Sequence, residues 1–573
     1  MACLFAGKLR YDEKKMRYFI HYIIRRVQIK HVVIIWLLVN MASAFFTQLY
    51  SDEAYYTLFA KHLDFGYFDH PPLIALLIRM GLILFNNEFG VRLLSVIAIT
   101  IALYFTFELA EIQKPFLFLI AIFSIFGLNV LGFLALPDSP LLLFTVLFFV
   151  VYKKFLRKES YVNSLLLGLT ITAMLYSKYH GILIVIFTIF SNLKLIKSRK
   201  FYISVAVGFI LFVPHIIWQL NNDFVSISYQ LFERTASYYK GSFTYEYLFG
   251  QVLFYGPVSA VFMLVSAIIF KQSDLFEKAL KWNLWGFLGF FLVSTLKGRV
   301  EVNWTLPVII PLLIFFLKAS STRPLFEKWF CLLAYPVIII IVLLRVEIVY
   351  PVFNLKVSRI DDFRGHRELG KEIIAKCKGL PIITNSYQRA GIVSFYTNTF
   401  APSINVNSRR NQFNLWHADD SLRFKKVAYV NNYLDEGVKI QNPVYKDYKV
   451  TIIDSLPVMN DILINTRLRR LEVNPNETFD IKVVLLPKKA PDNYRDAGNY
   501  STRLYASLYS EDNLLNKEVC PLPIDLLLKW NKGEYNFHLN APAQSGNYKI
   551  FISLNTSEIG IWSTKKTIYL TVR

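Results

Sequence analysis

The amino-acid sequence predicts an α-helical membrane protein that ends in an extramembrane region rich in β-strands. Hydrophobic residues make up 54% of the 573 residues and the mean hydropathy is +0.38, which is more apolar than is usual for a soluble protein. Apolar runs of about 17–25 residues, long enough to cross a hydrocarbon core, recur between His31 and Tyr350. After Tyr350 the hydropathy falls and stays low. We therefore expect a membrane-embedded part followed by an extramembrane part.

The membrane-embedded part is expected over residues 1–350, with its N-terminus in the cytoplasm and its C-terminus outside. Lysines and arginines crowd the N-terminus and every second loop, as the positive-inside rule requires. The apolar segment 71–86 has Arg79 at its centre and is better suited to an interfacial helix, because an extra span would reverse the side of every later loop. We expect about eleven spans, at residues 31–49, 90–110, 115–134, 140–156, 162–177, 179–193, 201–220, 246–270, 281–297, 304–319 and 328–349.

Two extramembrane domains are expected after the last span. Residues 351–458 have an α/β pattern, with a helix at 367–378 and strands at 381–384 and near 426–430. Residues 459–573 alternate apolar and polar positions between turn signals, which predicts a small β-sandwich. Its strands are expected at 467–473, 479–485, 503–509, 535–539, 548–554 and 567–572.

Composition argues against several other classes of protein. The net charge of +22 comes from basic residues in short loops between apolar runs, without a recognition motif, so nucleic-acid binding is not expected. The four cysteines (Cys3, Cys331, Cys377 and Cys520) show no CxxC spacing, although Cys377 and Cys520 could pair in an oxidising compartment. The basic N-terminal stretch lacks a small-residue cleavage site after its apolar run and predicts an uncleaved first helix.

The loop after the first span carries the densest acidic cluster, with Asp52-Glu53 and, seventeen residues after Asp52, Asp69-His70. One carboxylate there could take a proton from a hydroxyl, and the other could hold a divalent cation against a phosphate. The simpler interpretation is a set of solvated charges that cap interfacial helices. Two prolines follow His70 and place it at a helix N-terminus. A histidine at such a position is more often an ordinary cap or an interfacial residue than a metal ligand.

Further polar residues lie in later loops on the same predicted side. Asp138 lies in a Pro-Asp-Ser-Pro turn, where aspartate is also an ordinary turn residue. Lys178 interrupts two apolar runs and either extends to the interface or neutralises an anion. Arg299 and Asn303 share a loop and could bind phosphate and sugar hydroxyls, next to Trp304, which suits an interfacial belt. Such loops could meet a lipid-linked phosphate at the membrane surface.

Several of these motifs resemble the bacterial family 39 glycosyltransferases. The resemblance rests on Asp52–Tyr56 and Gly66–Leu73, and is supported by Pro137–Pro140, Ser177–Tyr179, Asn303-Trp304 and the later string Ser408–Trp416. The family is related to dolichyl-phosphate-mannose protein mannosyltransferases and to the aminoarabinose transferase that modifies lipid A, and all of them share the GT-C membrane fold. The resemblance covers about residues 30–430 and does not include the sandwich.

The resemblance implies roles for single residues. Asp52 matches the catalytic aspartate of the family. Asp69 matches the acidic residue that helps to hold a metal in some members, and Asp52 would then be a second metal ligand. His70 stands where the aminoarabinose branch has lysine, which puts a lipid A acceptor in doubt and leaves the phosphate-binding cation to be found elsewhere. Donor or phosphate binding is expected from His70, Asp138, Lys178, Arg299 and Asn303, and a supporting role from Glu53 and Tyr55.

The predicted function is an inner-membrane glycosyltransferase with its active site on the periplasmic side. It would move a sugar from polyprenyl phosphate to a hydroxyl of a lipid, glycan or protein with inversion, aided by a divalent metal of unspecified identity. A transporter or flippase of a lipid-linked sugar is the alternative, although such proteins place polar groups near mid-bilayer in repeated halves. A third possibility is a scaffold protein whose membrane part is only an anchor, but one helix would be enough to anchor such a protein.

Overall fold

The computed structural model describes residues 27–234, 239–353, 355, 361–404, 410–442, 444–459, 461–494, 501–510, 513–556, 561–562 and 566–573. The chain forms two compact units. The first, which we call the helical unit, comprises Met1–Thr47, His70–Trp218 and Tyr239–Leu355. The second, the mixed unit, comprises Gln48–Asp69, Gln219–Tyr238 and Lys356–Arg573. Two segments of the N-terminal half therefore belong with the C-terminal part of the chain.

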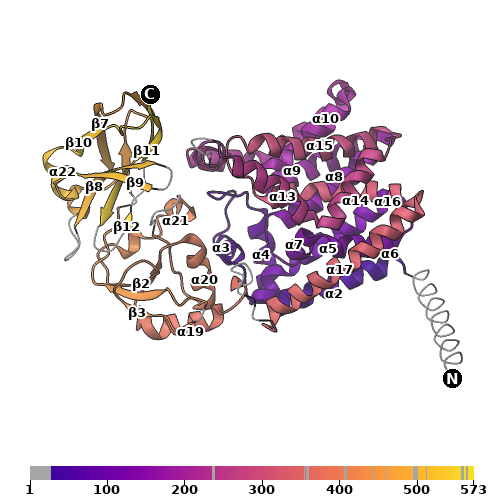
Figure 1. Cartoon of the computed structure of the whole chain (residues 1–573), viewed down its shortest axis with the longest axis horizontal. Coiled ribbons are helices and arrows are strands. Elements are labelled where there is room, and N and C mark those ends of the chain that lie inside the picture. Colours follow the sequence, from indigo (N-terminus) through magenta and orange to yellow (C-terminus); the bar gives the residue numbers. More distant parts are fainter. Residues whose placement is uncertain are drawn as a thin grey trace. The chain divides into compact units, whose positions relative to one another are not determined.

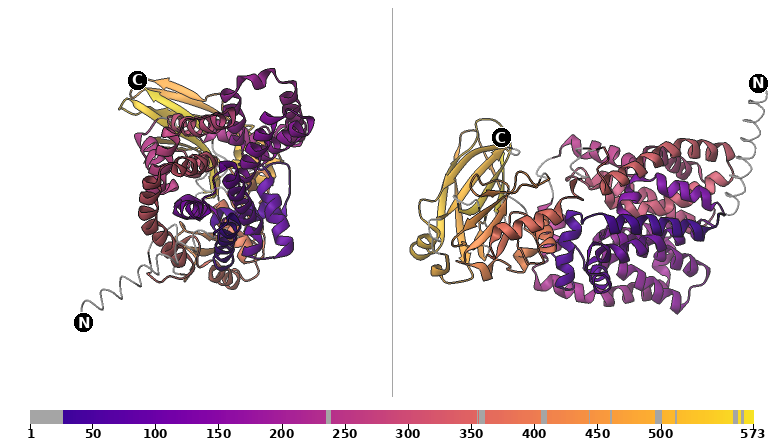
Figure 2. Two further views of the ribbon diagram at one scale, coloured as in Figure 1. Left: turned by 90° about the vertical axis from the view of Figure 1, so that its right-hand side faces the viewer. Right: turned by 90° about the horizontal axis from the view of Figure 1, so that it is seen from below.

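The helical unit is a bundle of helices joined by short connections (Figures 1 and 2). Its elements are α2 (Ile29–Phe46), α4 (Leu73–Leu84), α5 (Glu88–Ala110), α6 (Pro115–Ser124), α7 (Phe126–Leu131), α8 (Asp138–Arg157), α9 (Tyr161–Ser177), η1 (Tyr179–Gly181), α10 (Ile182–Ser191), η2 (Leu193–Lys197), α11 (Arg199–Asn221), α13 (Gly241–Tyr255), α14 (Pro257–Ile269), α15 (Leu275–Ser294), η4 (Val302–Val308), α16 (Ile309–Ser321) and α17 (Pro324–Val349).

Six helical segments in the described chain are long and apolar enough to cross a membrane, or seven if the bent pair α13 and α14 is one span. Helix is present in all of the predicted spans, but several of these helices are short, so the figure of about eleven spans and their orientation stay predictions. The six segments are Ile29–Phe46, Glu88–Ala110, Asp138–Arg157, Arg199–Asn221, Val302–Ser321 and Pro324–Val349.

The predicted span 246–270 is not one straight helix. α13 and α14 meet at an angle of 96° around Gly256. Gly256 has φ +82°, a backbone conformation that residues with a side chain rarely adopt. A Cβ at this position would also lie 2.4 Å from the carbonyl oxygen of Ser124, which is too close. Pro257 then starts α14, where its missing N–H costs nothing. Hydropathy misses this break because the residues on both sides of it are apolar.

The segment 71–86 forms α4, which has 12 residues. At 1.5 Å per residue this is about 18 Å, too short for a hydrocarbon core of about 30 Å. α4 packs closely on α5, since a Cβ on Gly81 would lie 2.0 Å from the carbonyl oxygen of Gly90. The length agrees with the expectation that this segment does not span, and its interfacial position stays a prediction.

The mixed unit contains the predicted α/β region. The helix at 367–378 and the strands at 381–384 and 426–430 are present, as α19, β1 and β2. One sheet has the order β1-β2-β4-β3, in which β1 and β2 are parallel and the other pairs antiparallel. The elements are α3 (Ser51–Lys61), α12 (Val225–Ser228), η3 (Tyr229–Glu233), α19 (His366–Cys377), β1 (Ile382–Thr384), α20 (Tyr387–Tyr396), α21 (Gln412–Leu415), η5 (Asp420–Leu422), β2 (Val427–Asn431), β3 (Val438–Lys439) and β4 (Lys449–Ile453).

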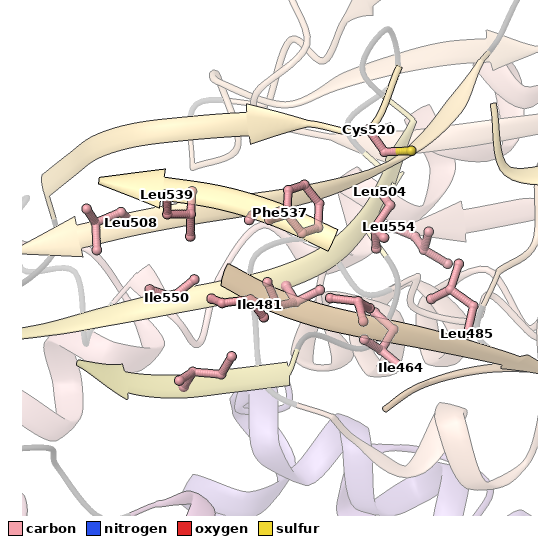
Figure 3. Close-up of a cluster of buried hydrophobic side chains, with 14 of the residues drawn as sticks. Ile464, Ile481, Leu485, Leu504, Leu508, Cys520, Phe537, Leu539, Ile550 and Leu554 are labelled. Atoms are coloured by element: carbon pink, nitrogen blue, oxygen red, sulfur yellow. The ribbon is translucent and has the colours of Figure 1, made fainter. Parts of the chain in front are cut away.

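The last part of the mixed unit is built from two β-sheets that share one apolar core. One sheet has the order β10-β7-β5 and the other β6-β13-β11-β8-β9, with β12 paired to β11. Along β7 exposed and buried residues alternate, and Ile481, Phe537 and Ile550 from both sheets lie in the same buried cluster (Figure 3).

All six predicted strands are present, while the sequence missed β5, β9, β12 and α22. The elements are β5 (Ile462–Asn465), β6 (Arg470–Val473), β7 (Thr478–Pro487), η6 (Pro491–Tyr494), β8 (Thr502–Ser510), β9 (Asn513–Val519), α22 (Ile524–Trp530), β10 (Glu534–Asn540), β11 (Gly546–Thr556), β12 (Ile561–Trp562) and β13 (Lys566–Val572).

Candidate functional site

The first acidic motif lies in the opening turn of α3, in the mixed unit. Glu53 is fully buried, and its Oε2 accepts a hydrogen bond of 2.9 Å from the backbone N–H of Tyr50, so this carboxylate caps its own helix. Asp52 is only half-buried, and its Oδ1 accepts a hydrogen bond of 2.8 Å from Nε2 of Gln388. Both carboxylates lie at the positive end of the helix dipole. The two neighbours therefore differ in their surroundings: Glu53 supports the helix, and Asp52 remains accessible.

Gln388 reaches Asp52 because α20 packs directly on α3. Gly391 makes this approach possible, since a Cβ at this position would lie 2.4 Å from the backbone nitrogen of Tyr55. The rings of Tyr55 and Tyr387 meet edge to face with their centroids 4.8 Å apart. The sequence prediction gave Tyr55 a supporting role, and the structure shows a buried residue at the contact between these two helices.

Gln412 ties the two acidic motifs together. Its backbone N–H donates to the hydroxyl of Tyr55 at 3.0 Å, and its Oε1 accepts from the backbone N–H of Phe68 at 2.7 Å. Gln412 belongs to the string Ser408–Trp416, of which Ser408 and Arg409 lie outside the described chain. Through its backbone and its side chain, Gln412 thus links the helix that carries Asp52 to the residue before Asp69.

Asp69 is the last residue of the segment Gln48–Asp69, which belongs to the mixed unit, and its exposed fraction is 4%. Its backbone oxygen accepts from Nε2 of Gln230 at 3.1 Å, and the hydroxyl of Ser226 donates to the backbone oxygen of Tyr67 at 2.8 Å. The short helices α12 and η3 therefore hold the chain around Asp69. His70, the next residue, is grouped with the helical unit.

A second polar cluster lies within the helical unit, where three separate elements begin or end. Asp138 opens α8, Lys178 lies between α9 and η1, and Asn303 lies in η4. Nζ of Lys178 donates to both carboxylate oxygens of Asp138, at 2.9 and 2.8 Å, and Nδ2 of Asn303 donates to Oδ2 at 3.1 Å. The side chains of Lys178 and Asp138 are only 6% and 3% exposed. Three of the predicted donor-site residues therefore meet in a buried ion pair with an amide.

Arg299 does not join this cluster. Its guanidinium lies 3.2 Å from the carboxylate of Glu246, and both side chains are more than half exposed. Such a pair contributes little energy. A donor-site role for Arg299 stays a prediction that these contacts do not favour.

The sequence prediction overlooked His180, which lies beside the Asp138–Lys178 pair. The ring of His180 packs near those of Phe291 and Trp304, with ring centroids 5.7 and 6.4 Å away. Gln388 was overlooked as well, and Gln412 was included only as part of the string Ser408–Trp416, without a role of its own. A glutamine in a mixed polar region has no spacing or hydropathy signal that marks it as a partner of a distant carboxylate.

The predicted metal has no ready-made protein site in the described chain, which contains no group of three or more His, Cys, Asp or Glu side chains placed to hold a metal ion. Asp52 and Asp69 would supply two carboxylates at most. Mg²⁺ is commonly held in that way, by one or two carboxylates with water and substrate phosphate as the other ligands. The two aspartates fit a cation of this type only if substrate completes the site, and a metal requirement stays a prediction.

Comparison with known proteins agrees with the motifs. Residues 69–218 match the family profile described as dolichyl-phosphate-mannose-protein mannosyltransferase. The lipid A galacturonosyltransferase RgtD of Rhizobium johnstonii is 22% identical over 287 residues, which are 45% of this chain and 58% of that protein. The chain thus spans little more than half the length of this curated relative.

Solved structures with a similar fold include ArnT from Cupriavidus metallidurans. Its apo structure gives a TM-score of 0.52 at 12% identity and covers 74% of this chain and 97% of ArnT. The structure bound to undecaprenyl phosphate gives a TM-score of 0.51 at 13% identity, with the same coverage. The fold is therefore the GT-C fold of ArnT, with a C-terminal β region.

These likenesses confirm the predicted resemblance. The chain is a multi-pass membrane protein related to the GT-C glycosyltransferases.

Proposed function

We propose that this protein transfers a sugar from a polyprenyl phosphate to a hydroxyl group at the periplasmic face of the inner membrane. The acceptor oxygen loses its proton to the carboxylate of Asp52 and forms a bond to the anomeric carbon. The bond from that carbon to the phosphate oxygen breaks, and its electron pair leaves with polyprenyl phosphate. A single displacement of this kind inverts the anomeric configuration.

The observation that carries the proposal is the environment of Asp52. Its carboxylate is half-buried at the start of α3 and receives a hydrogen bond from a neutral amide. An amide N–H adds no charge of its own, so this contact by itself leaves the carboxylate able to accept a proton. This supports Asp52 over the capping Glu53 as the general base.

The Asp138–Lys178–Asn303 cluster suits the leaving group. The charge of Lys178 is balanced by Asp138, so the two together present a fixed dipole with an ammonium end rather than a free cation. A preorganised dipole aimed at developing negative charge stabilises a transition state without reorganising. We assign this cluster, with His70, to the donor phosphate.

The donor lipid and the acceptor are proposed by analogy. One relative was solved with undecaprenyl phosphate, and another is named as a lipid A galacturonosyltransferase. Undecaprenyl-phosphate galacturonic acid is therefore the first donor to try, alongside other sugars. Because His70 departs from the aminoarabinose branch, lipid A is tried together with glycan and protein acceptors.

The test uses the full chain in nanodiscs with a panel of synthetic undecaprenyl-phosphate sugars and candidate acceptors. Release of undecaprenyl phosphate by the wild type, and a rate lower by about 10²–10⁴-fold in Asp52→Asn, is the expected result. A wild-type rate in Asp52→Asn would reject Asp52 as the base. Movement of the labelled donor between leaflets without release would instead support a transporter.

The same assay tests the metal. If Asp52 and Asp69 hold a cation with the donor phosphate, chelator should abolish turnover and a divalent cation should restore it. Full activity in chelator would exclude the metal and leave charge stabilisation to the Asp138–Lys178–Asn303 cluster.

A further inference from the structure

α20 lies more than 300 residues after Asp52 in sequence, yet it supplies the side chain that contacts this carboxylate. Gln388 and Asp52 are separated by 336 positions and joined by a hydrogen bond of 2.8 Å. The family profile does not reach either residue of this pair, because it matches residues 69–218 only. The question is what a glutamine from the extramembrane region does at this carboxylate.

The helix that bears Gln388 is fixed at its start. The hydroxyl of Ser386 accepts from the backbone N–H of Arg389 at 3.1 Å and caps α20. The guanidinium of Arg389 lies over the rings of Tyr445 and Tyr448, 4.2 and 4.4 Å from their centroids. Gln388, the second residue of the helix, therefore projects from backbone that is held on both sides.

The helix is fixed on its other face by α3 itself. Gly391 lies so close to the backbone of Tyr55 that a Cβ would overlap it, and the ring of Tyr387 packs on that of Tyr55. The distance between α20 and α3 is therefore set by backbone contact. Because both partners are held, the amide of Gln388 meets Asp52 in a defined geometry.

The chemistry of an amide suits a residue that orients a base. Nε2 of Gln388 donates to Oδ1 of Asp52 and restricts rotation of the carboxylate. An arginine or lysine would do the same but would also pair the charge and weaken the base. A misplacement of about 1 Å can cost about 10²-fold in rate, so a rigid neutral donor has a clear use here.

We propose that Gln388 is a positioning residue that orients the Asp52 carboxylate for proton transfer from the acceptor hydroxyl. The inference rests on the proposed function, and it makes turnover depend on the extramembrane region. Gln412 supports the arrangement from the other side, since it joins Tyr55 to the residue before Asp69.

The experiment compares Gln388→Met and Gln388→Glu with the wild type in the full chain, in the release assay and with whichever donors of the panel the wild type turns over. Both substitutions keep the length of the side chain and remove the N–H donor. Gln441→Met is the matched control, because Gln441 is exposed and its side chain makes no hydrogen bond or ion pair with the residues that the structure describes.

The expected result is a fall in kcat of about tenfold to hundredfold in both Gln388 variants, with donor KM within about twofold of the wild type. The thermal unfolding midpoint of Gln388→Met should match that of Gln441→Met, whereas Gln388→Glu also places a second carboxyl group against Asp52. A merely structural role would show as a lower midpoint or a raised KM in Gln388→Met.

Two results would overturn the inference: kcat near the wild-type value in either Gln388 variant, or a loss of activity that follows a loss of folding. Asp52→Asn is measured alongside. If Asp52→Asn loses activity and the Gln388 variants do not, only the positioning role fails. If Asp52→Asn keeps full activity, or no donor is turned over, the proposed function fails first and this inference fails with it.

Discussion

The two acidic clusters of this protein hold their carboxylates in opposite ways. In the helical unit, Asp138 is buried and paired with a lysine through both oxygens. In the mixed unit, Asp52 is half-buried and receives a hydrogen bond from an amide. The lysine fixes the first carboxylate in a desolvated ion pair, whereas the amide contacts the second without adding a charge of its own.

The difference shows how one chain can give two aspartates separate tasks. Asp138 keeps Lys178 in place and balances it, which suits a fixed electrostatic environment for a phosphate. Asp52 is only half-buried and is held by the amide of Gln388, which suits a group that takes up a proton. The assignment follows from surroundings, since both residues are the same amino acid at the start of a helix.

The strongest test of this comparison is Asp52→Asn, for which we expect turnover to fall by about 10²–10⁴-fold. The amide cannot take up the proton, but it fits the same space, so the thermal unfolding midpoint should stay close to that of the wild type. Release of undecaprenyl phosphate and a thermal scan on the same preparation give both values. A large loss of folding would make Asp52 structural, like Asp138.

Asp138→Asn should act mainly on stability. It leaves the ammonium of Lys178 buried without its carboxylate, and breaking a buried pair on one side costs about 3–5 kcal/mol. The measurement is thermal or denaturant unfolding in detergent.

The double variant Asp138→Leu/Lys178→Met serves as the control, because it removes both charges together. It should recover most of the stability and little of the activity. If it also recovered activity, the cluster would have no part in binding the donor phosphate.

Gly391→Ala should weaken the contact between α20 and α3. The added methyl group would overlap the backbone of Tyr55, which cannot move aside like a flexible side chain, and overpacking of this kind costs about 1–3 kcal/mol. Because α20 would shift as a unit, turnover should fall as well. Gly379→Ala makes a useful comparison for unfolding: it adds strain at φ +77° but meets no atom within 4 Å. Equal effects of the two variants on turnover would argue against the packing explanation.

The smallest expected effect concerns Asp420, a carboxylate intermediate between the two types. Its side chain is 31% exposed and lies 3.2 Å from Arg423 and 3.1 Å from Lys489. Burial favours the neutral form of Asp420, but the hydrogen bonds and charges of Lys489 and Arg423 outweigh it and lower the pKa.

A lowered folded-state pKa means that the stabilisation is present above the unfolded pKa of about 3.9 and is lost as the pH falls through the folded value. Asp420→Asn should therefore reduce stability at neutral pH by up to about 1 kcal/mol and flatten the acid side of the unfolding profile. Asp454→Asn, at a more exposed ion pair with Lys426, should change this profile less. If Asp420→Asn left the dependence of stability on pH unchanged at acidic pH, Lys489 and Arg423 would not stabilise the charged form of Asp420.

Local patterns determined much of this protein. Apolar runs placed the long helices, and alternation placed six strands of the sandwich, because both signals depend on residues only a few positions apart. The same patterns failed at Gly256, where apolar residues continue through a 96° bend, and at β9, where all seven residues are exposed and no alternation remains.

The sequence by itself also singled out Asp52, Asp69, Asp138, Lys178 and Asn303, through motifs that are short and contiguous. Only the tertiary structure decided which of them meet. It paired Asp138 with Lys178 across 40 positions, left Arg299 in another ion pair and brought Gln388 to Asp52 across 336. The physical reason is that a hydrogen bond between distant residues depends on how whole helices pack, and packing is set by many side chains together, such as the absent one at Gly391.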